Sequence, residues 1–212
     1  MKKASTDFNR EFYKDYRQIK AECKGQNPKL LLHVCCGACS CYPLIFLANL
    51  FDITVLFTNS NISTIEEFET RYKAFEKHAN FIEKPCKTSI FFVKDDYDYE
   101  EFRKDLLPLK DEKEGGTRCH LCITKRMKRL FEYAQTNGFK YVSTIMSISR
   151  NKDAEFINTL GKKLENQYPG INFLTFDFKK NEGQEIGVNL SKLEGIYRQD
   201  FCGCEFSTEI DD

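Results

Sequence analysis

The chain has no stretch approaching the roughly 20 consecutive apolar residues that a membrane-spanning helix needs. Its first residues, Met1 to Asp7, include two lysines but no apolar core, so they do not form a secretion signal. The 32 basic residues are balanced by 32 acidic ones, and no overall field draws the protein to a polyanion or a membrane surface. These absences predict a cytoplasmic protein with no membrane partner.

Internal repeats, low-complexity tracts and interdomain linkers are also missing from the sequence. At 212 residues the chain is long enough to form one domain with a core of its own. We expect a helical extension over residues 1–28 and a single α/β domain over 29–212 that ends in a Cys-Gly-Cys tail.

Cysteine, in contrast, is abundant, with ten residues in the chain. A reducing cytosol argues against a framework of disulfides and favours metal binding or redox chemistry. Cys23 and Cys86 stand alone and are interpreted as small buried hydrophobic residues, while the role of Cys41 stays open.

Apolar and β-branched runs alternate with segments of helical periodicity along the whole chain. Such alternation predicts a parallel, doubly wound sheet of about five strands flanked by helices. The expected strands are 29–34, 53–57, 90–94, 141–146 and 172–176, and the expected helices are 8–21, 42–51, 64–84, 99–107, 117–137, 153–166 and 188–193.

Eight of the cysteines form three groups that are far apart in the sequence. Four lie between Cys35 and Cys41, directly after the first strand, and the others are the pairs Cys119/Cys122 and Cys202/Cys204. Ligands of open α/β sheets bind at the carboxyl ends of the strands. We therefore expect the fold to bring the three groups together there.

Cys119 and Cys122 are three residues apart in the first turn of a predicted helix, so their side chains share one face. The helix dipole and the neighbouring Arg118 favour the thiolate, which is the form that binds metals. Together with Cys35 and Cys36 they supply the four thiolates that an iron–sulfur cluster or a structural zinc ion requires.

Cys202-Gly203-Cys204 places two thiols on either side of a glycine. This spacing can close a strained, easily reduced disulfide, which favours redox exchange. Two further metal ligands, or two spare thiols, are the alternatives. A basic run, residues 125–129, is either a solvated helix face or a site for nucleic-acid phosphates.

With these residues assembled, the sequence resembles the QueH-type epoxyqueuosine reductase family from about residue 30 to residue 207. The resemblance rests on Leu-His-Val-Cys-Cys-x-x-Cys (32–39), Gly-Gly-x-Arg-Cys-x-x-Cys (115–122), Ser-Ile-Ser (147–149) and Tyr-Arg-Gln-Asp-Phe-Cys-Gly-Cys-x-Phe-Ser (197–207). It implies a fold of the PP-loop type. It also implies an enzyme that reduces epoxyqueuosine to queuosine at the wobble position of tRNA, with an external electron donor. No glycine-rich phosphate loop follows the first strand, so ATP chemistry is not expected.

The resemblance also implies roles for individual residues. Cys35, Cys36, Cys119 and Cys122 would hold a [4Fe–4S] cluster, and Cys202 and Cys204 would be the redox-active pair. An additional iron ion would lie beside the cluster, with Cys39 and Asp96, or Asp98, as its ligands. The basic helix would anchor the anticodon arm of tRNA, and Tyr97 or Tyr197 would stack on bases.

The chain departs from the usual family pattern in Ala38 and in two loops, 59–63 and 149–152. Two other functions remain open from the sequence. One is a zinc-stabilised RNA-binding module without catalysis, and the other is a metal-free thiol–disulfide oxidoreductase.

Overall fold

Five parallel strands form one sheet in the order β3-β2-β1-β4-β5 in the computed structural model, which describes residues 7–207. The strands are β1 (Lys29–Val34), β2 (Asp52–Phe57), β3 (Phe91–Lys94), β4 (Tyr141–Thr144) and β5 (Asn172–Phe173). The α/β class and the doubly wound parallel sheet are confirmed. The segment 1–6, expected not to be a secretion signal, lies outside the described residues.

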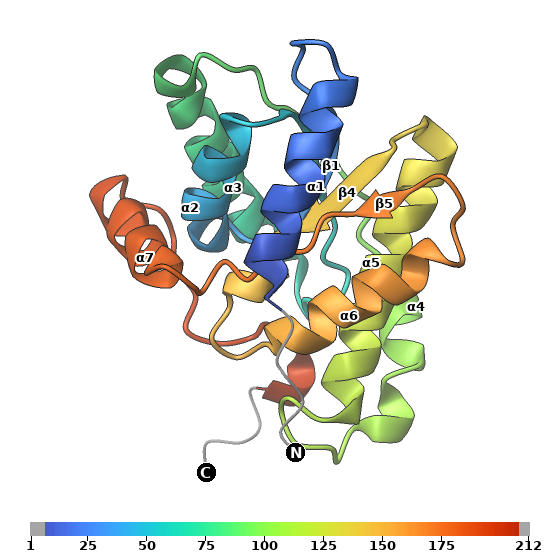
Figure 1. Ribbon diagram of the computed structural model, residues 1–212. Coiled ribbons are helices and arrows are strands. Elements are labelled where there is room, and N and C mark those ends of the chain that lie inside the picture. Colours follow the sequence, from blue (N-terminus) through green and yellow to red (C-terminus); the bar gives the residue numbers. More distant parts are fainter. Residues whose placement is uncertain (1–6, 208–212) are drawn as a thin grey trace.

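The helices form two groups, with the strands between them (Figure 1). α2 packs against both α3 and α7, whereas α5 packs against α6 and contacts β1 and β4. The helices are α1 (Phe8–Glu22), α2 (Gly37–Ala48), α3 (Ile65–Cys86), α4 (Tyr99–Lys104), α5 (Thr117–Asn137), α6 (Ala154–Glu165) and α7 (Gly183–Leu193), with short 3₁₀ turns η1 (Leu107–Leu109), η2 (Ile145–Ile148) and η3 (Glu205–Ser207).

The core is built around β1, which is buried along its length except for Lys29. Leu30, Leu31, Leu32 and Val34 have no exposed surface, as expected for the central strand of a sheet covered on both faces. α1 joins the same core through Phe12, whose ring packs edge-on against Phe176.

Several element boundaries differ from the sequence prediction; α7, for example, begins at Gly183 rather than at residue 188. α2 begins at Gly37 rather than at residue 42, so Cys39 and Cys41 lie on a helix and not in a loop. α3 continues through Pro85 and ends only where Lys87 adopts a left-handed conformation. β5 keeps two residues of the five expected, because the chain leaves the sheet after Phe173.

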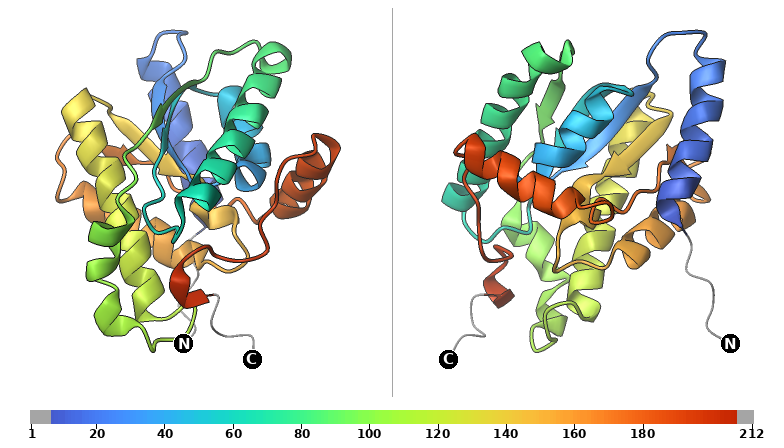
Figure 2. Two further views of the ribbon diagram at one scale, coloured as in Figure 1. Left: turned by 180° about the vertical axis from the view of Figure 1, so that it is seen from behind. Right: turned by 60° about the vertical axis from the view of Figure 1, so that its left-hand side comes forward.

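The strand order reverses between β1 and β4, since connections from β1 run to one side of the sheet and those from β4 to the other. At such a switch point the loops after the two strands separate and leave a crevice at their carboxyl ends. The C-terminal segment returns to this end of the molecule, and η3 lies beside the loop before α5 in both views of Figure 2.

Within residues 7–207, every helix is too short or too polar to cross a membrane.

Candidate functional site

A cavity of about 540 Å³ lies at the switch point of the sheet. Seven cysteines line it, and they come from all three groups of the sequence: Cys35, Cys36, Cys39, Cys119, Cys122, Cys202 and Cys204. The expectation that the fold gathers these groups is confirmed. All ten cysteines of the chain are free thiols in this structure.

Cys35 and Cys36 are the last extended residues of the β1–α2 corner, and both are buried. Cys36 is hydrogen-bonded to Cys35 on one side and to Cys39 on the other. The hydrogen bond that the Cys35 thiol donates to Cys36, together with burial, raises the pKa of Cys35 well above its ordinary value. The hydrogen bond with Cys35 lowers the pKa of Cys36. Cys39 and burial outweigh this effect and raise the pKa of Cys36 to about 12.

Cys119 and Cys122 project from the first turns of α5, which begins after Gly116 without a side-chain cap. The N–H of Gly115 donates to Cys119 Sγ at 3.3 Å. The expected lowering of thiol pKa by the helix is wrong for Cys122, because burial raises its pKa to about 11 although Arg126 acts in the opposite direction.

Arg118 does not assist these thiols as expected. Its Nη1 donates to the carbonyls of Lys110 at 2.6 Å and Glu112 at 2.5 Å, and its guanidinium lies 4.8 Å from the centre of the Phe206 ring. Arg118 is 2% exposed. Its task is therefore to hold the loop before α5 and the η3 turn together.

Cys202 and Cys204 have opposite electrostatic environments. A hydrogen bond from Cys204, followed by the charges of Lys152 and Arg126, holds the pKa of Cys202 well below its ordinary value despite burial. The same hydrogen bond and burial raise the pKa of Cys204. Cys202 is thus the thiolate of the pair and Cys204 its protonated partner, the asymmetry needed for thiol–disulfide exchange.

Arg126 is the central cation of the cavity wall. Its Nη2 donates to Asn59 Oδ1 at 3.0 Å and lies 3.4 Å from His33 Nε2, and Asn59 in turn donates to the carbonyl of Cys35 at 2.9 Å. His33 is neutral, because burial and Arg126 lower its pKa well below its ordinary value. In the described part of the chain no carboxylate forms an ion pair with Arg126, and its Nε has no partner.

Lys152, a half-buried residue of the loop before α6, adds a second positive charge to the cavity lining. Burial lowers the pKa of Lys152, but Cys35 and Cys202 raise it by more, so the ammonium stays charged. The sequence prediction missed both cations. The available signal for Arg126 was its position four residues after Cys122, which places it on the same helix face.

Four residues proposed from the sequence, two acids as iron ligands and two tyrosines as base-stacking residues, lie outside the cavity lining. Asp96 is exposed on the loop after β3, two strands from β1, and is not part of the cavity lining. Asp98 caps α4 by accepting from the N–H of Glu101. Tyr97 and Tyr197 donate their hydroxyls to the Ile62 carbonyl and to Glu67.

The basic run 125–129 does not form one positive face. Lys125 pairs with Asp105 at 2.5 Å, Arg129 pairs with Asp95 at 2.8 Å, and Arg126 is buried in the cavity wall. Only Lys128, of these cations, is exposed with no ion pair among the described residues. Phosphate binding by this helix therefore stays a prediction.

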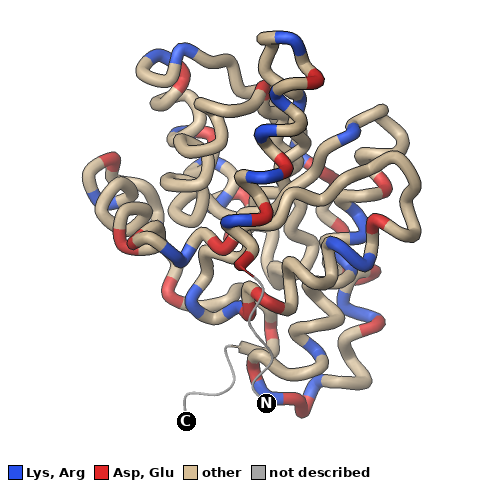
Figure 3. The backbone as a smooth tube through the Cα atoms, viewed as in Figure 1, with Lys and Arg blue, Asp and Glu red and all other residues tan. Residues whose placement is uncertain are grey.

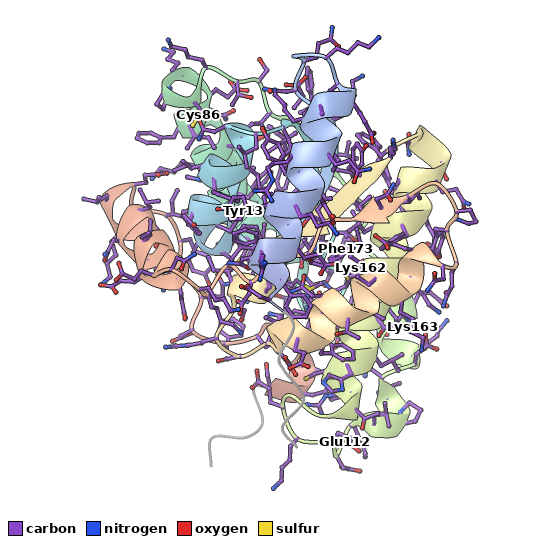
Figure 4. All side chains as sticks on the ribbon, viewed as in Figure 1. Tyr13, Cys86, Glu112, Lys162, Lys163 and Phe173 are labelled. Atoms are coloured by element: carbon purple, nitrogen blue, oxygen red, sulfur yellow. The ribbon has the colours of Figure 1, made fainter. Side chains whose placement is uncertain are left out.

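The remaining cysteines are placed away from the cavity. Cys86 lies at the end of α3, at the opposite end of the molecule from Glu112, whose loop precedes α5 (Figure 4). Cys23 follows α1 and packs at the edge of the core. Cys41 is fully buried on α2, where its Sγ donates to the Gly37 carbonyl at 3.4 Å.

Comparisons with known proteins agree on one family. The model of the family "Epoxyqueuosine reductase QueH" matches residues 30–210. The chain is 35% identical to the epoxyqueuosine reductase QueH of Staphylococcus epidermidis, over 86% of this chain and 77% of the relative. It is 36% identical to that of Thermotoga maritima, over 84% of this chain and 89% of the relative.

Among solved structures, an NH₃-dependent NAD synthetase from Campylobacter jejuni matches with a TM-score of 0.34 and 13% identity, covering 92% of this chain and 98% of that one. This similarity is too weak to support a conclusion about fold or function. The family model spans all three cysteine groups that line the cavity. The chain therefore belongs to the epoxyqueuosine reductase QueH family.

Proposed function

We propose that this chain reduces the epoxide of epoxyqueuosine in tRNA to the alkene of queuosine. The observation that carries the proposal is the convergence of seven thiols from three separate segments on one cavity at the switch point. The names of the relatives supply the substrate and the reaction. Because tRNA is the proposed substrate, we expect a cytoplasmic enzyme, to which a donor outside this chain returns electrons after each turnover.

A [4Fe–4S] cluster, in this proposal, is held by Cys35, Cys36, Cys119 and Cys122. Four thiols with two of them adjacent suit a cluster, because each thiolate then bonds a different iron. When bound, the cluster supplies one-electron transfer.

The charge of the cavity wall supports an anionic occupant. Arg126 and Lys152 both face the thiols, and Arg126 is 4% exposed without a carboxylate ion pair in residues 7–207. A buried, unpaired cation costs several kcal/mol, so such a residue persists where an anion compensates it. Thiolates around a cluster provide that negative charge.

Cys39 is the remaining thiol of the lining and would be a ligand for the additional iron ion. In the structure, Cys39 is hydrogen-bonded to Cys36. An iron ion held there supplies Lewis acidity. Asp96, which does not line the cavity, is left out of this proposal.

The two electrons of the reduction come from Cys202 and Cys204. The S–H bond of Cys204 and the two C–O bonds of the epoxide break. One S–S bond, the second bond of the alkene and the two O–H bonds of water form, with the second proton of that water taken from solvent. Cys202 begins this exchange, because its lowered pKa makes it the nucleophile. Lys152, beside Cys202, holds its thiolate in place.

The anticodon arm of tRNA is the proposed partner at the cavity mouth. Arg150 and Arg198 are exposed there and provide positive charge for phosphates near the wobble base. This location replaces α5 as the expected tRNA-binding surface.

Anaerobic purification followed by a visible spectrum and assays for iron and acid-labile sulfide tests the cofactor. We expect four iron and four sulfide atoms per chain from the cluster, with additional iron when the second site is filled. Cys119→Ser and Cys122→Ser should lose the cluster, and Cys23→Ser is the matched control, since Cys23 lies outside the cavity. A colourless protein containing zinc would support the RNA-binding alternative instead.

Reduction of epoxyqueuosine-containing tRNA by a chemical electron donor tests the reaction. Cys202→Ser should abolish queuosine formation while the iron content stays that of the unmodified protein. Full activity of Cys202→Ser would contradict the role of the pair. Activity that survives both chelation and loss of Cys119 would favour the metal-free oxidoreductase.

A further inference from the structure

Arg71 and Ser63 hold the main chain of the Cys-Gly-Cys segment at three successive carbonyls. Arg71 Nη1 donates to the carbonyl of Cys202 at 2.9 Å, and its Nη2 donates to that of Phe201 at 3.4 Å. The N–H of Ser63 donates to the Gly203 carbonyl at 2.9 Å, and its Oγ donates to the same oxygen at 3.3 Å. The thiols themselves take no part in these contacts.

The guanidinium is fixed on every side. Its Nε donates to Glu67 Oε1 at 2.6 Å one turn earlier on α3, and Glu67 accepts a second hydrogen bond, from the Tyr197 hydroxyl at 3.0 Å. The Phe201 ring lies over the guanidinium at 5.3 Å. With 5% of its surface exposed, Arg71 has no freedom to swing away.

Gly203 fits this arrangement for two reasons. Its φ of +96° is a conformation that side chains disfavour, and a Cβ at this position would lie 2.7 Å from Arg71 Nη2 and 3.0 Å from Arg71 Cζ. The central residue of the Cys-x-Cys sequence is therefore glycine because the flat guanidinium lies directly against it.

We propose that Arg71 is a positioning residue, which with Ser63 clamps residues 201–203 in the dithiol form and so makes the Cys202–Cys204 disulfide easier to reduce. The inference rests on the proposed redox role of this pair. In this proposal, closing a disulfide across one residue changes the backbone torsions at Gly203 and turns the carbonyls on either side away from their donors. Hydrogen bonds made only in the dithiol form shift the equilibrium toward it.

Equilibration with glutathione tests the clamp in the full-length, anaerobically purified protein. One glutathione disulfide oxidises the two thiols to the Cys202–Cys204 disulfide and leaves as two reduced glutathione molecules. Alkylation followed by mass measurement of the peptide containing both cysteines reports this pair alone.

Arg71→Ala should raise the equilibrium constant for oxidation about tenfold, which corresponds to a potential lower by about 30 mV for a two-electron couple. Arg71→Lys should show a rise of similar size, because an ammonium keeps the charge but cannot reach two carbonyls and lie flat on Gly203. If Arg71→Ala does not fold, Arg71→Lys carries the test. Millimolar guanidinium should restore the original value in Arg71→Ala only.

Lys77→Ala is the matched control, because Lys77 is also a cation of α3 that donates to a carbonyl of the C-terminal segment, that of Gly195 at 3.0 Å. Its equilibrium constant should stay within twofold of the original. An unchanged constant in Arg71→Ala, or no response to guanidinium, would overturn the clamp alone. An unmodified pair that never forms a disulfide would overturn the proposed role of the pair, and the clamp with it.

Discussion

Two buried arginines on α5, Arg118 and Arg126, are about two helical turns apart and have opposite surroundings. Arg118 gives its Nη1 to backbone carbonyls of the loop before the helix, whereas Arg126 donates to one amide oxygen and faces thiols. The first is a structural cross-link and the second is an unbalanced charge. Residue type alone does not separate the two, because both are basic residues on a predicted helix.

Replacing each by methionine should therefore give opposite results in metal-free protein. Arg126→Met removes the buried unpaired charge and should raise the free energy of unfolding by about 1–3 kcal/mol, while iron and sulfide content after reconstitution falls. Arg118→Met leaves its carbonyls without a donor and should lower that free energy by about 2–4 kcal/mol. Urea unfolding and iron assays measure both, and a destabilised Arg126→Met protein with full iron content would contradict the expectation.

The reactivity of Cys202 should depend on its partner thiol. Because the pKa of Cys202 is lowered, its thiolate persists to lower pH than that of an ordinary cysteine, and alkylation by iodoacetamide should stay fast below pH 8. Cys204→Ala removes the main cause of the lowering, so the pH midpoint should move upward and the rate at pH 7 should fall. Lys152→Gln should shift the midpoint in the same direction by less. A midpoint that does not move in Cys204→Ala would refute the assignment.

At the scale of elements, α2 lies in close contact with the backbone of α3 at Gly37, the first residue of α2. A Cβ there would lie 2.4 Å from the backbone carbon of Ala74 and 2.6 Å from the backbone N of Phe75. Backbone atoms cannot rotate away as a side chain would. The start of α2 therefore depends on the absence of a side chain.

Gly37→Ala should lower the free energy of unfolding by about 3 kcal/mol, at the upper end of the usual cost of overpacking. Gly187→Ala, in α7, is the matched control, because its nearest neighbours are 3.5 Å away and alanine favours the helix by about 0.5–1 kcal/mol. Denaturant unfolding compares the two. Equal free energies of unfolding for the two variants would show that α2 can shift away from α3 without loss of stability.

Sequence pattern predicts elements where the local signal is strong. β1 agrees to the residue, since an apolar run starts soon after Pro28 and ends before Gly37, and the end of α5 agrees because Gly138 adopts a left-handed conformation with φ of 72°. The start of α2 has no capping side chain, so nothing in Cys36 to Cys41 signals a helix. Asp96 is not among the residues that line the cavity, because strand order, which the sequence does not specify, decides which loops meet.

For the whole molecule, charge is distributed without a dominant sign. Lysines and arginines alternate with acidic residues along the chain (Figure 3), and the totals are 32 and 32. Binding of tRNA therefore depends on a few local contacts, and its affinity should respond weakly to salt. Sequence composition predicted this balance, but only the fold shows that the cavity carries positive charge.

Arg150→Gln should weaken tRNA binding and lower the salt slope by about one, because Arg150 is exposed at the cavity. Lys128→Gln should leave both unchanged, since Lys128 lies on the helix whose other cations are paired or buried. Binding measured at several salt concentrations tests the pair. Weaker binding in Lys128→Gln, with no change in Arg150→Gln, would indicate that tRNA binds at α5 instead.

Arg71 and Ser63 grip the Cys-Gly-Cys segment by its peptide oxygens and leave both sulfur atoms untouched. Replacing both cysteines by serine should therefore abolish reduction and leave the backbone conformation of the segment unchanged. An inert protein of this kind, mixed with unreduced tRNA, would form a stalled complex suitable for crystallisation or cryo-microscopy.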